Sequence, residues 1–267
     1  MKKKLLLYGT FLKLRILMNF QFPMSYWLGF CGQIVSYGST FCVIFIAVSS
    51  FGNLNGWTAD EILLLYAFEL LSYAIGAFFC FHPSVGLANN IRTGAFDASL
   101  TKPLNPFIFQ ILNYGQDIAY FSHFILSFVV MIYALIHIGI AFTFANIVTI
   151  VLFVVGASAI QGGILVLCSV FSFKMVNDNP FFTVFFQAKN FIKYPISIYG
   201  NILQVLLTFV LPLGFINFYP AQFLLSKHSG TFNYMLGIIT PFVGATVFII
   251  AYSLWMKRLK HYNSSGS

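Results

Sequence analysis

Glu69 is a carboxylate placed about two turns into an otherwise apolar stretch of residues, 61–81. Tyr66, Tyr73 and Gly76 follow the same spacing of three or four residues, so all four share one face if the stretch is a helix. A charged carboxylate in an apolar setting is costly unless it is protonated, paired or hydrated. We therefore expect Glu69 either to contact a cationic or amphipathic ligand or to be a hydrogen-bonded structural acid.

Two further stripes of small or polar residues occur at helical spacing. One contains Gly32, Ser36 and Thr40, and the other contains Asn201, Gln204 and Thr208. Such faces turn toward protein or a watery cavity, so each stripe marks either a helix contact or a pathway. Aromatic rings beside a pathway add apolar and cation–π surface. The predicted pathway residues are Gln33, Tyr37, Glu69, Tyr73, Gln204 and Thr208.

The sequence lacks the motifs of a membrane enzyme. It contains neither an H-E-x-x-H helix motif nor a G-x-x-x-x-G-K-[ST] phosphate-binding loop. His123 and His137 share a helix face, but fourteen residues of helix separate them by about 20 Å, which favours two interhelical histidines over a proton relay or metal pair. The four cysteines lack ligand spacing. We predict no catalytic residue, no metal site and no cofactor bound by this chain.

Six runs of roughly 20 apolar residues are each long enough to cross a bilayer as a helix. With 59% hydrophobic and 7% charged residues, the chain has too little polar surface for a water-soluble globule. The backbone must satisfy its own hydrogen bonds in lipid, so an all-α integral membrane protein is expected. The predicted spans are 27–50, 61–81, 114–140, 145–173, 198–218 and 232–256.

The basic residues are sorted by side of the membrane in this topology. Of the fourteen Lys and Arg residues, Lys227 alone falls on the outer side. Basic residues beside a span resist translocation, which places both termini in the cytoplasm of a multi-pass protein of a bacterial plasma membrane. The charge of +8 is clustered beside apolar runs, so we expect anionic membrane lipids as partners and no nucleic acid.

The predicted chain is a single transmembrane domain, 1–262, followed by a short tail or linker, 263–267. Residues 1–24 mix basic and apolar residues, which predicts an uncleaved amphipathic helix in the inner interface. Residues 82–113 form a cytoplasmic loop. Pro212 and Gly214 interrupt the fifth span, which predicts a broken or re-entrant outer segment over 211–231.

Four ordered segments resemble the type-2 ABC exporter permeases, most closely the branch of viologen-exporter-like and multidrug-exporter-like permeases. The first inner loop, I-R-T-G-A-F-D-A-S-L-T-K-P-L-N-P at 91–106, carries most of the resemblance. The others are G-W-T-A-D-E-I-L-L-L-Y at 56–66, K-Y-P-I-S-I-Y at 193–199 and L-P-L-G-F-I-N-F-Y-P-A at 211–221.

The resemblance implies a permease subunit of an exporter that moves an amphipathic or cationic small molecule, peptide or lipid outward. Two ABC ATPase subunits on separate chains would bind ATP and Mg, and a second permease, identical or related, would complete a dimer. The first inner loop would dock on the ATPase as a coupling helix, with Arg92, Asp97, Lys102 and Pro103 as the docking residues. The family also implies that spans one, two and five line the cavity.

Two other interpretations remain open from the sequence. An oligomeric channel or scaffold without an ATPase would explain the polar stripes equally well, although it gives no reason for the 91–106 loop. An intramembrane enzyme acting on a lipid would require turnover that depends on Glu69.

Overall fold

The computed structural model describes residues 9–11, 13–14, 17–18, 21, 23–115, 119–175, 179–227 and 230–264, which form helices and no β-sheet. Five helices in this part of the chain are long and apolar enough to cross a membrane. They are α2 (Pro23–Phe51), α3 (Ala59–Val85), α7 (Tyr120–Ile138), α8 (Phe144–Ser172) and α12 (Gly230–Leu259). Five of the six predicted spans therefore correspond to long apolar helices.

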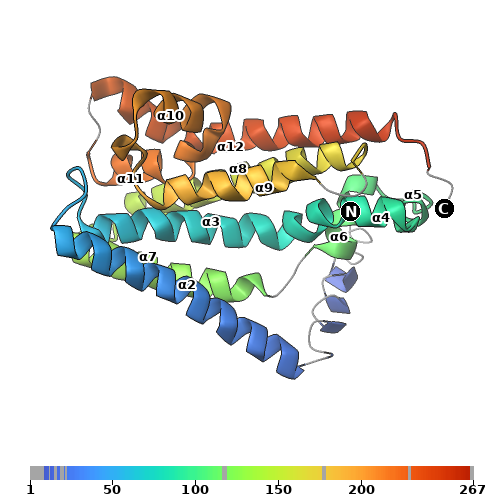
Figure 1. Ribbon diagram of the computed structural model, residues 1–267, viewed down its shortest axis with the longest axis horizontal. Helices are drawn as coiled ribbons and strands as arrows, with labels where there is room; N and C mark the ends of the chain where they lie inside the picture. The colour runs from blue at the N-terminus through green and yellow to red at the C-terminus, as the bar shows by residue number, and fades with distance from the viewer. Residues whose placement is uncertain are drawn as a thin grey trace.

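Helix α3 is the central element of the bundle, and Figure 1 shows it running between α7 and α8. Thr58 caps its first turn, and the Glu61 side chain accepts a hydrogen bond from the Thr58 backbone N–H at 2.8 Å. Most of its residues are buried on all sides, as in a helix surrounded by protein. By contrast, α2 buries only Phe41, Ile44 and Val48 and leaves most of its surface exposed.

Two helix crossings depend on glycine. A Cβ atom on Gly76 of α3 would lie 2.7 Å from the Ser158 carbonyl oxygen of α8, and one on Gly156 of α8 would lie 2.7 Å from the Pro241 Cα atom of α12. Any side chain would push these backbones apart, so the missing side chains allow α3, α8 and α12 to pack closely.

Three short helices close one end of the bundle, here called the α5 end. They are α4 (Leu87–Arg92), α5 (Ala95–Leu100) and α6 (Pro106–Tyr114). Phe96 of α5 is fully buried, and its ring centroid lies 5.6 Å from that of Phe173 and 5.2 Å from that of Tyr262. The loop predicted for 82–113 is therefore mostly helical and is anchored to the bundle by an aromatic ring.

The opposite end, here called the α11 end, holds a broken helical hairpin where the interrupted span 198–218 was predicted (Figure 1). Helix α10 (Asn201–Val205) continues as a π-helical turn, η3 (Leu206–Val210), and stops before Pro212. A 3₁₀ turn, η4 (Pro212–Phe215), then leads into α11 (Phe218–Leu224). Thr208 and Tyr219 share a hydrogen bond of 2.8 Å between their hydroxyls, which holds the two arms together.

The predicted interruption at Pro212 is thus confirmed, while the re-entrant position of this segment and the count of six spans remain predictions. Proline has no N–H to donate to the preceding turn, and Leu211 before it is extended.

The chain instead passes from the α5 end to the α11 end through α9 (Pro180–Lys189) and two 3₁₀ turns, η1 (Asn190–Lys193) and η2 (Ile196–Ile198). At its start, the Asn179 side chain donates to the Cys168 carbonyl at 2.7 Å, near the end of α8. At its finish, the Ser197 carbonyl accepts from the Asn55 side chain at 3.1 Å. The sequence predicted residues 174–197 as a cytoplasmic connection. The structure shows short helices and turns over 180–198 that run along the bundle, and the side of the membrane on which they lie remains a prediction.

The two ends of the chain are described only in part. Residues 9–11, 13–14 and 17–18 are helical, and the ring of Phe11 lies 6.1 Å from that of Phe109 in α6. Residues 1–8, 12, 15–16, 19–20 and 22 of the predicted interfacial helix 1–24 lie outside the described residues, as do residues 265–267 of the predicted tail and residues 228–229 of the predicted outer segment. The domain limits remain predictions.

Candidate functional site

A polar cavity of about 450 Å³ lies between α2, α3, α9 and η1. Hydroxyl, amide and charged groups from four elements face it. The cavity thus brings together residues that are distant in the sequence. The cavity is lined by Ser36, Tyr37, Thr40, Tyr66, Glu69, Leu70, Tyr73, Phe81, Phe186, Lys189, Asn190 and Lys193.

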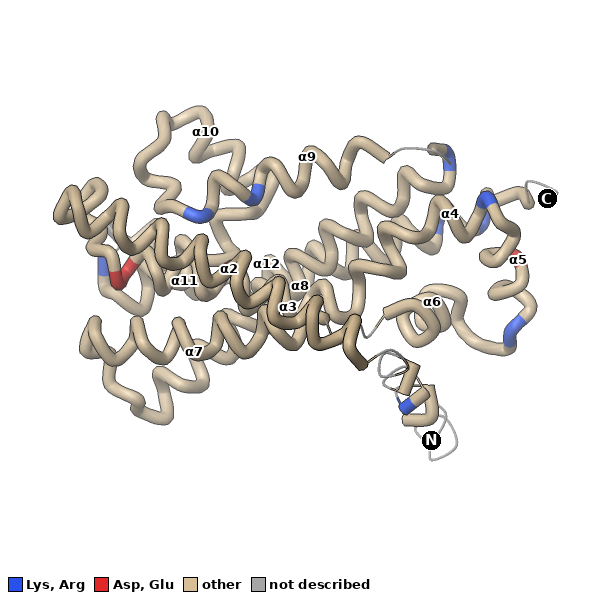
Figure 2. The backbone as a smooth tube through the Cα atoms, turned by 60° about the horizontal axis from the view of Figure 1, so that its bottom comes forward, with Lys and Arg blue, Asp and Glu red and all other residues tan. Residues whose placement is uncertain are grey.

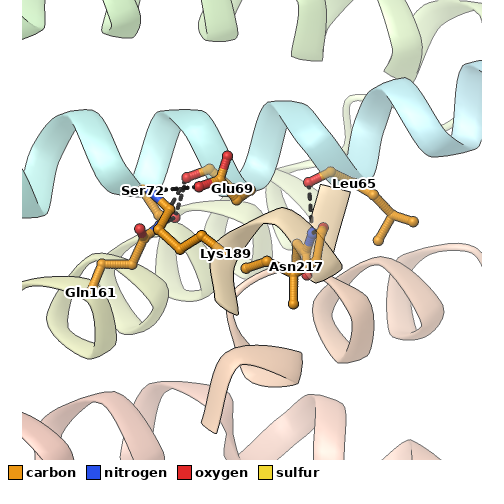
Figure 3. Close-up of polar contacts among 7 residues, drawn as sticks. Leu65, Glu69, Ser72, Gln161, Lys189 and Asn217 are labelled. Atoms are coloured by element: carbon orange, nitrogen blue, oxygen red, sulfur yellow. Dashed lines mark hydrogen bonds and ion pairs between the residues drawn. The ribbon is translucent and has the colours of Figure 1, made fainter. Parts of the chain in front are cut away.

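A buried ion pair forms one wall of this cavity. The Lys189 Nζ atom lies 2.7 Å from Glu69 Oε1, and their side chains are 11% and 5% exposed. The same ammonium lies 3.3 Å from the centroid of the Tyr73 ring, a cation–π contact. Figure 3 shows Lys189 reaching from α9 toward Glu69 on α3. Glu69 therefore has the polar neighbour that its position requires.

Side-chain amides of neighbouring segments donate hydrogen bonds to backbone carbonyls of α3 on both sides of this ion pair (Figure 3). The Gln161 amide of α8 donates to the Glu69 carbonyl at 2.8 Å and to the Ser72 hydroxyl at 2.7 Å. One turn earlier, the buried Asn217 amide donates to the Leu65 carbonyl at 3.2 Å and to the Ile192 carbonyl at 2.5 Å. These contacts tie α3, α8, η1 and the start of α11 into one rigid wall.

Lys193 adds a second ammonium to the cavity. Of the acidic residues that the structure describes, Glu69 alone lines this space, and it is already paired with Lys189. The expected preference for cationic amphiphiles was based on the Glu69 carboxylate. The structure pairs that carboxylate with Lys189, and the substrate preference remains a prediction.

The structure brings together half of the predicted pathway residues. Tyr37, Glu69 and Tyr73 line the cavity. Gln33 is partly exposed on α2 and does not line it. Gln204 donates to the Tyr199 carbonyl at 2.8 Å, and Thr208 bonds Tyr219, so these two side chains stabilise the hairpin at the α11 end. The roles of all six in transport remain predictions.

The predicted docking residues gather at the α5 end, where Figure 2 also shows several other basic positions. Arg92, Lys102 and Pro103 are exposed. Asp97 is half-buried and accepts a hydrogen bond from Ser264 at 2.7 Å. Burial, with the negative charge of Asp97 nearby, raises the pKa of Tyr262 to about 12, so this phenol stays neutral at the end of the bundle.

The sequence analysis missed Lys189, Asn190 and Lys193 as cavity residues. The spacing of apolar residues in this segment was a signal for Lys189, because Lys189 falls on the same helical face as apolar residues that recur every three or four positions. This face consists of Phe182, Phe185, Lys189, Ile192 and Ile196, and the structure buries it.

An all-helical bundle with five apolar helices of membrane-spanning length and a polar cavity between them is the architecture of a multi-pass membrane protein. The family model described as ABC-2 family transporter protein matches residues 34–266, so the chain belongs to this family. Comparisons with curated proteins and with solved structures found no match. The resemblance to type-2 ABC permeases is thereby confirmed.

Membership makes the chain a multi-pass membrane component of an ABC transporter, a class in which the ATPase is a separate subunit. Among the described residues, no group of three or more His, Cys, Asp or Glu side chains could hold a metal ion.

Proposed function

We propose that this chain is the permease subunit of an ABC exporter and that the Glu69 cavity is part of its transport pathway. The chain crosses the membrane six times, with residues 180–198 as the fifth crossing and the hairpin of α10 and α11 re-entering from outside. Both termini lie in the cytoplasm of a bacterial cell. The substrate is an amphipathic molecule that moves outward.

The observation that carries this proposal is the position of a polar, partly open cavity between helices of an ABC-2 family chain. A buried ion pair is a costly way to stabilise a fold, because an apolar pair of similar volume is often as stable. Ionisable groups at membrane depth commonly mark a pathway.

The α5 end is the proposed docking site for two ATPase subunits, which bind the ATP and Mg. Arg92 and Lys102 are exposed there and can pair with acidic groups of a partner. Phe96 connects this surface to Phe173 after α8 and to Trp255 of α12, so movement of α5 is passed directly to the bundle.

A second permease, identical or related, is the proposed partner of α2. This helix exposes Val35, Val43 and Ile46 on the bundle's outside and buries little against its own chain. It also forms one wall of the cavity through Tyr37, so a second subunit beside α2 would enclose the pathway.

Co-purification tests the proposal. The full chain, isolated from its native membrane in mild detergent, is expected to bring down an ATP-binding chain with a G-x-x-x-x-G-K-[ST] loop. Arg92→Glu should reduce the recovery of that chain several-fold, because a reversed charge repels an acidic groove. Asn201→Glu, which adds a negative charge at the exposed start of α10 at the opposite end of the bundle, is the control and should leave recovery unchanged.

Recovery of a stable oligomer without any ATP-binding chain would contradict the proposal and favour a stand-alone channel or scaffold. Lipid turnover by the isolated chain that is lost in Glu69→Gln would instead indicate an enzyme.

A further inference from the structure

The charges of the described residues around the cavity do not cancel. Glu69 and Lys189 neutralise each other at 2.7 Å, while Lys193 lines the same space and has no ion-pair partner among the described residues. None of the other described carboxylates lines the cavity: Asp60 and Glu61 lie in the first turn of α3, and Asp97 lies in α5. Within the described part of the chain, the cavity therefore carries one ammonium more than it has carboxylates.

Hydrogen-bonding residues line the same cavity as Lys193. The hydroxyls of Tyr37, Thr40 and Tyr66 and the amide of Asn190 all line it. Hydroxyls and amides donate to anionic oxygens, and donors beside an ammonium make a charge-assisted site.

The other end of the cavity is aromatic. The ring centroids of Phe81 and Phe186 lie 6.2 Å apart, and both residues line the cavity. Phe186 precedes Lys193 by seven residues, which separates their backbone positions by about 10 Å at the usual helical rise. The cavity is thus polar and positive toward the α11 end and apolar toward the α5 end.

We propose that this cavity binds an amphipathic anion, with its carboxylate, phosphate or sulfate group beside Lys193 and its apolar body between Phe81 and Phe186. This inference rests on the proposed transport function for its physiological meaning, and it names the substrate class. Tyr37, Tyr66 and Asn190 hydrogen-bond the head group. The Glu69–Lys189 pair keeps the wall behind it neutral.

Equilibrium binding to the full chain in neutral phosphatidylcholine nanodiscs tests the inference without the ATPase. The probes are dansyl-aminoundecanoic acid, an anionic amphiphile, and the same molecule with trimethylammonium in place of the carboxylate. The anionic probe should bind at least tenfold more tightly than the cationic one. Lys193→Gln should weaken the anionic probe about tenfold, since hydrogen bonds to charged groups contribute of that order, and Lys193→Arg should retain most of the affinity.

Lys174→Gln is the matched control, because it removes an exposed lysine outside the cavity and should change neither affinity. Tighter binding of the cationic probe, strengthened further by Lys193→Gln, would overturn the anionic class and leave the cavity as a pathway. If neither Lys193→Gln nor Tyr73→Ala changes the affinity for either probe, the cavity is not the binding site. That result would also overturn the proposed pathway.

Discussion

Glu69 and Lys189 stabilise each other at a depth where either charge alone would be costly. The pair lies 2.7 Å apart with both side chains nearly buried, and the Tyr73 ring covers the ammonium at 3.3 Å. Removing one partner of such a pair leaves an uncompensated buried charge, whereas removing both does not.

We expect Glu69→Gln and Lys189→Met each to destabilise the chain by about 3 kcal/mol, and the double variant to recover at least half of that loss. Thermal unfolding in detergent, followed by tryptophan fluorescence, measures the three variants against the native chain. Losses that simply add in the double variant would show that the two side chains do not interact.

The residue types predicted that Glu69 needs a polar neighbour, but they could not identify Lys189. Lysines near an apolar run are normally assigned to the cytoplasmic side, and that rule places residue 189 in a loop. The ion pair compensates its charge, which allows Lys189 to be buried in the bundle. Tyr37 and Tyr73 were predicted from the polar stripes of the first two spans and from the family resemblance, and both line the cavity.

Among the elements, the close crossing of α8 and α12 depends on Gly156. We expect Gly156→Val to lower the thermal midpoint and the yield of folded chain, by about 2 kcal/mol or more, because the backbone of α12 at Pro241 occupies the space of a side chain. Gly29→Ala is the control, since nothing lies within 4 Å of a Cβ atom there. Equal behaviour of the two variants in a thermal melt would contradict this packing.

Helix α5 is joined to the bundle mainly through Phe96. Phe96→Ala should cost about 3–5 kcal/mol, as for other fully buried phenylalanines, and Phe96→Leu should cost less. If α5 also docks on the ATPase, Phe96→Leu should reduce ATPase-coupled transport at a temperature at which the variant is still folded. If hydrogen exchange shows that α5 is loosened in this variant while transport is unchanged, the Phe96 ring does not contribute to coupling.

The fifth span shows where apolar length misleads. Residues 198–218 have the length and composition of a membrane helix, and periodicity alone does not reveal that Pro212 folds them into a hairpin. Residues 180–198 contain two prolines and two lysines, which conceal their buried stripe. The short helices and 3₁₀ turns there depend on tertiary contacts such as that of Asn217 with Ile192.

Across the whole molecule, charge distinguishes the two ends. Figure 2 shows basic residues gathered around α4, α5 and the C-terminal end of the described chain. At the α11 end, Lys227 is bound: its Nζ atom lies 2.5 Å from Glu61 Oε2 and donates to the Gly56 carbonyl at 2.7 Å. The bound Lys227 ties the α11–α12 connection to the start of α3, whereas Arg92 and Lys102 lie exposed at the opposite end.

This arrangement predicts which residues a membrane-impermeant maleimide reaches in intact cells. In a chain whose four cysteines are replaced by alanine, single cysteines are introduced at Asn53, Lys102, Met175 and Asn201, all exposed. Asn53→Cys and Asn201→Cys should react from outside, because residues 180–198 carry the chain to the α11 end before α10 begins. Lys102→Cys and Met175→Cys should react only after the membrane is permeabilised. If Asn201→Cys is protected in intact cells, residues 174–197 lie in the cytoplasm as the sequence predicted, and the place of Lys193 in a membrane cavity is contradicted. If Lys102→Cys is labelled from outside, the orientation is the reverse of the proposed one, and docking of an ATPase at the α5 end is contradicted.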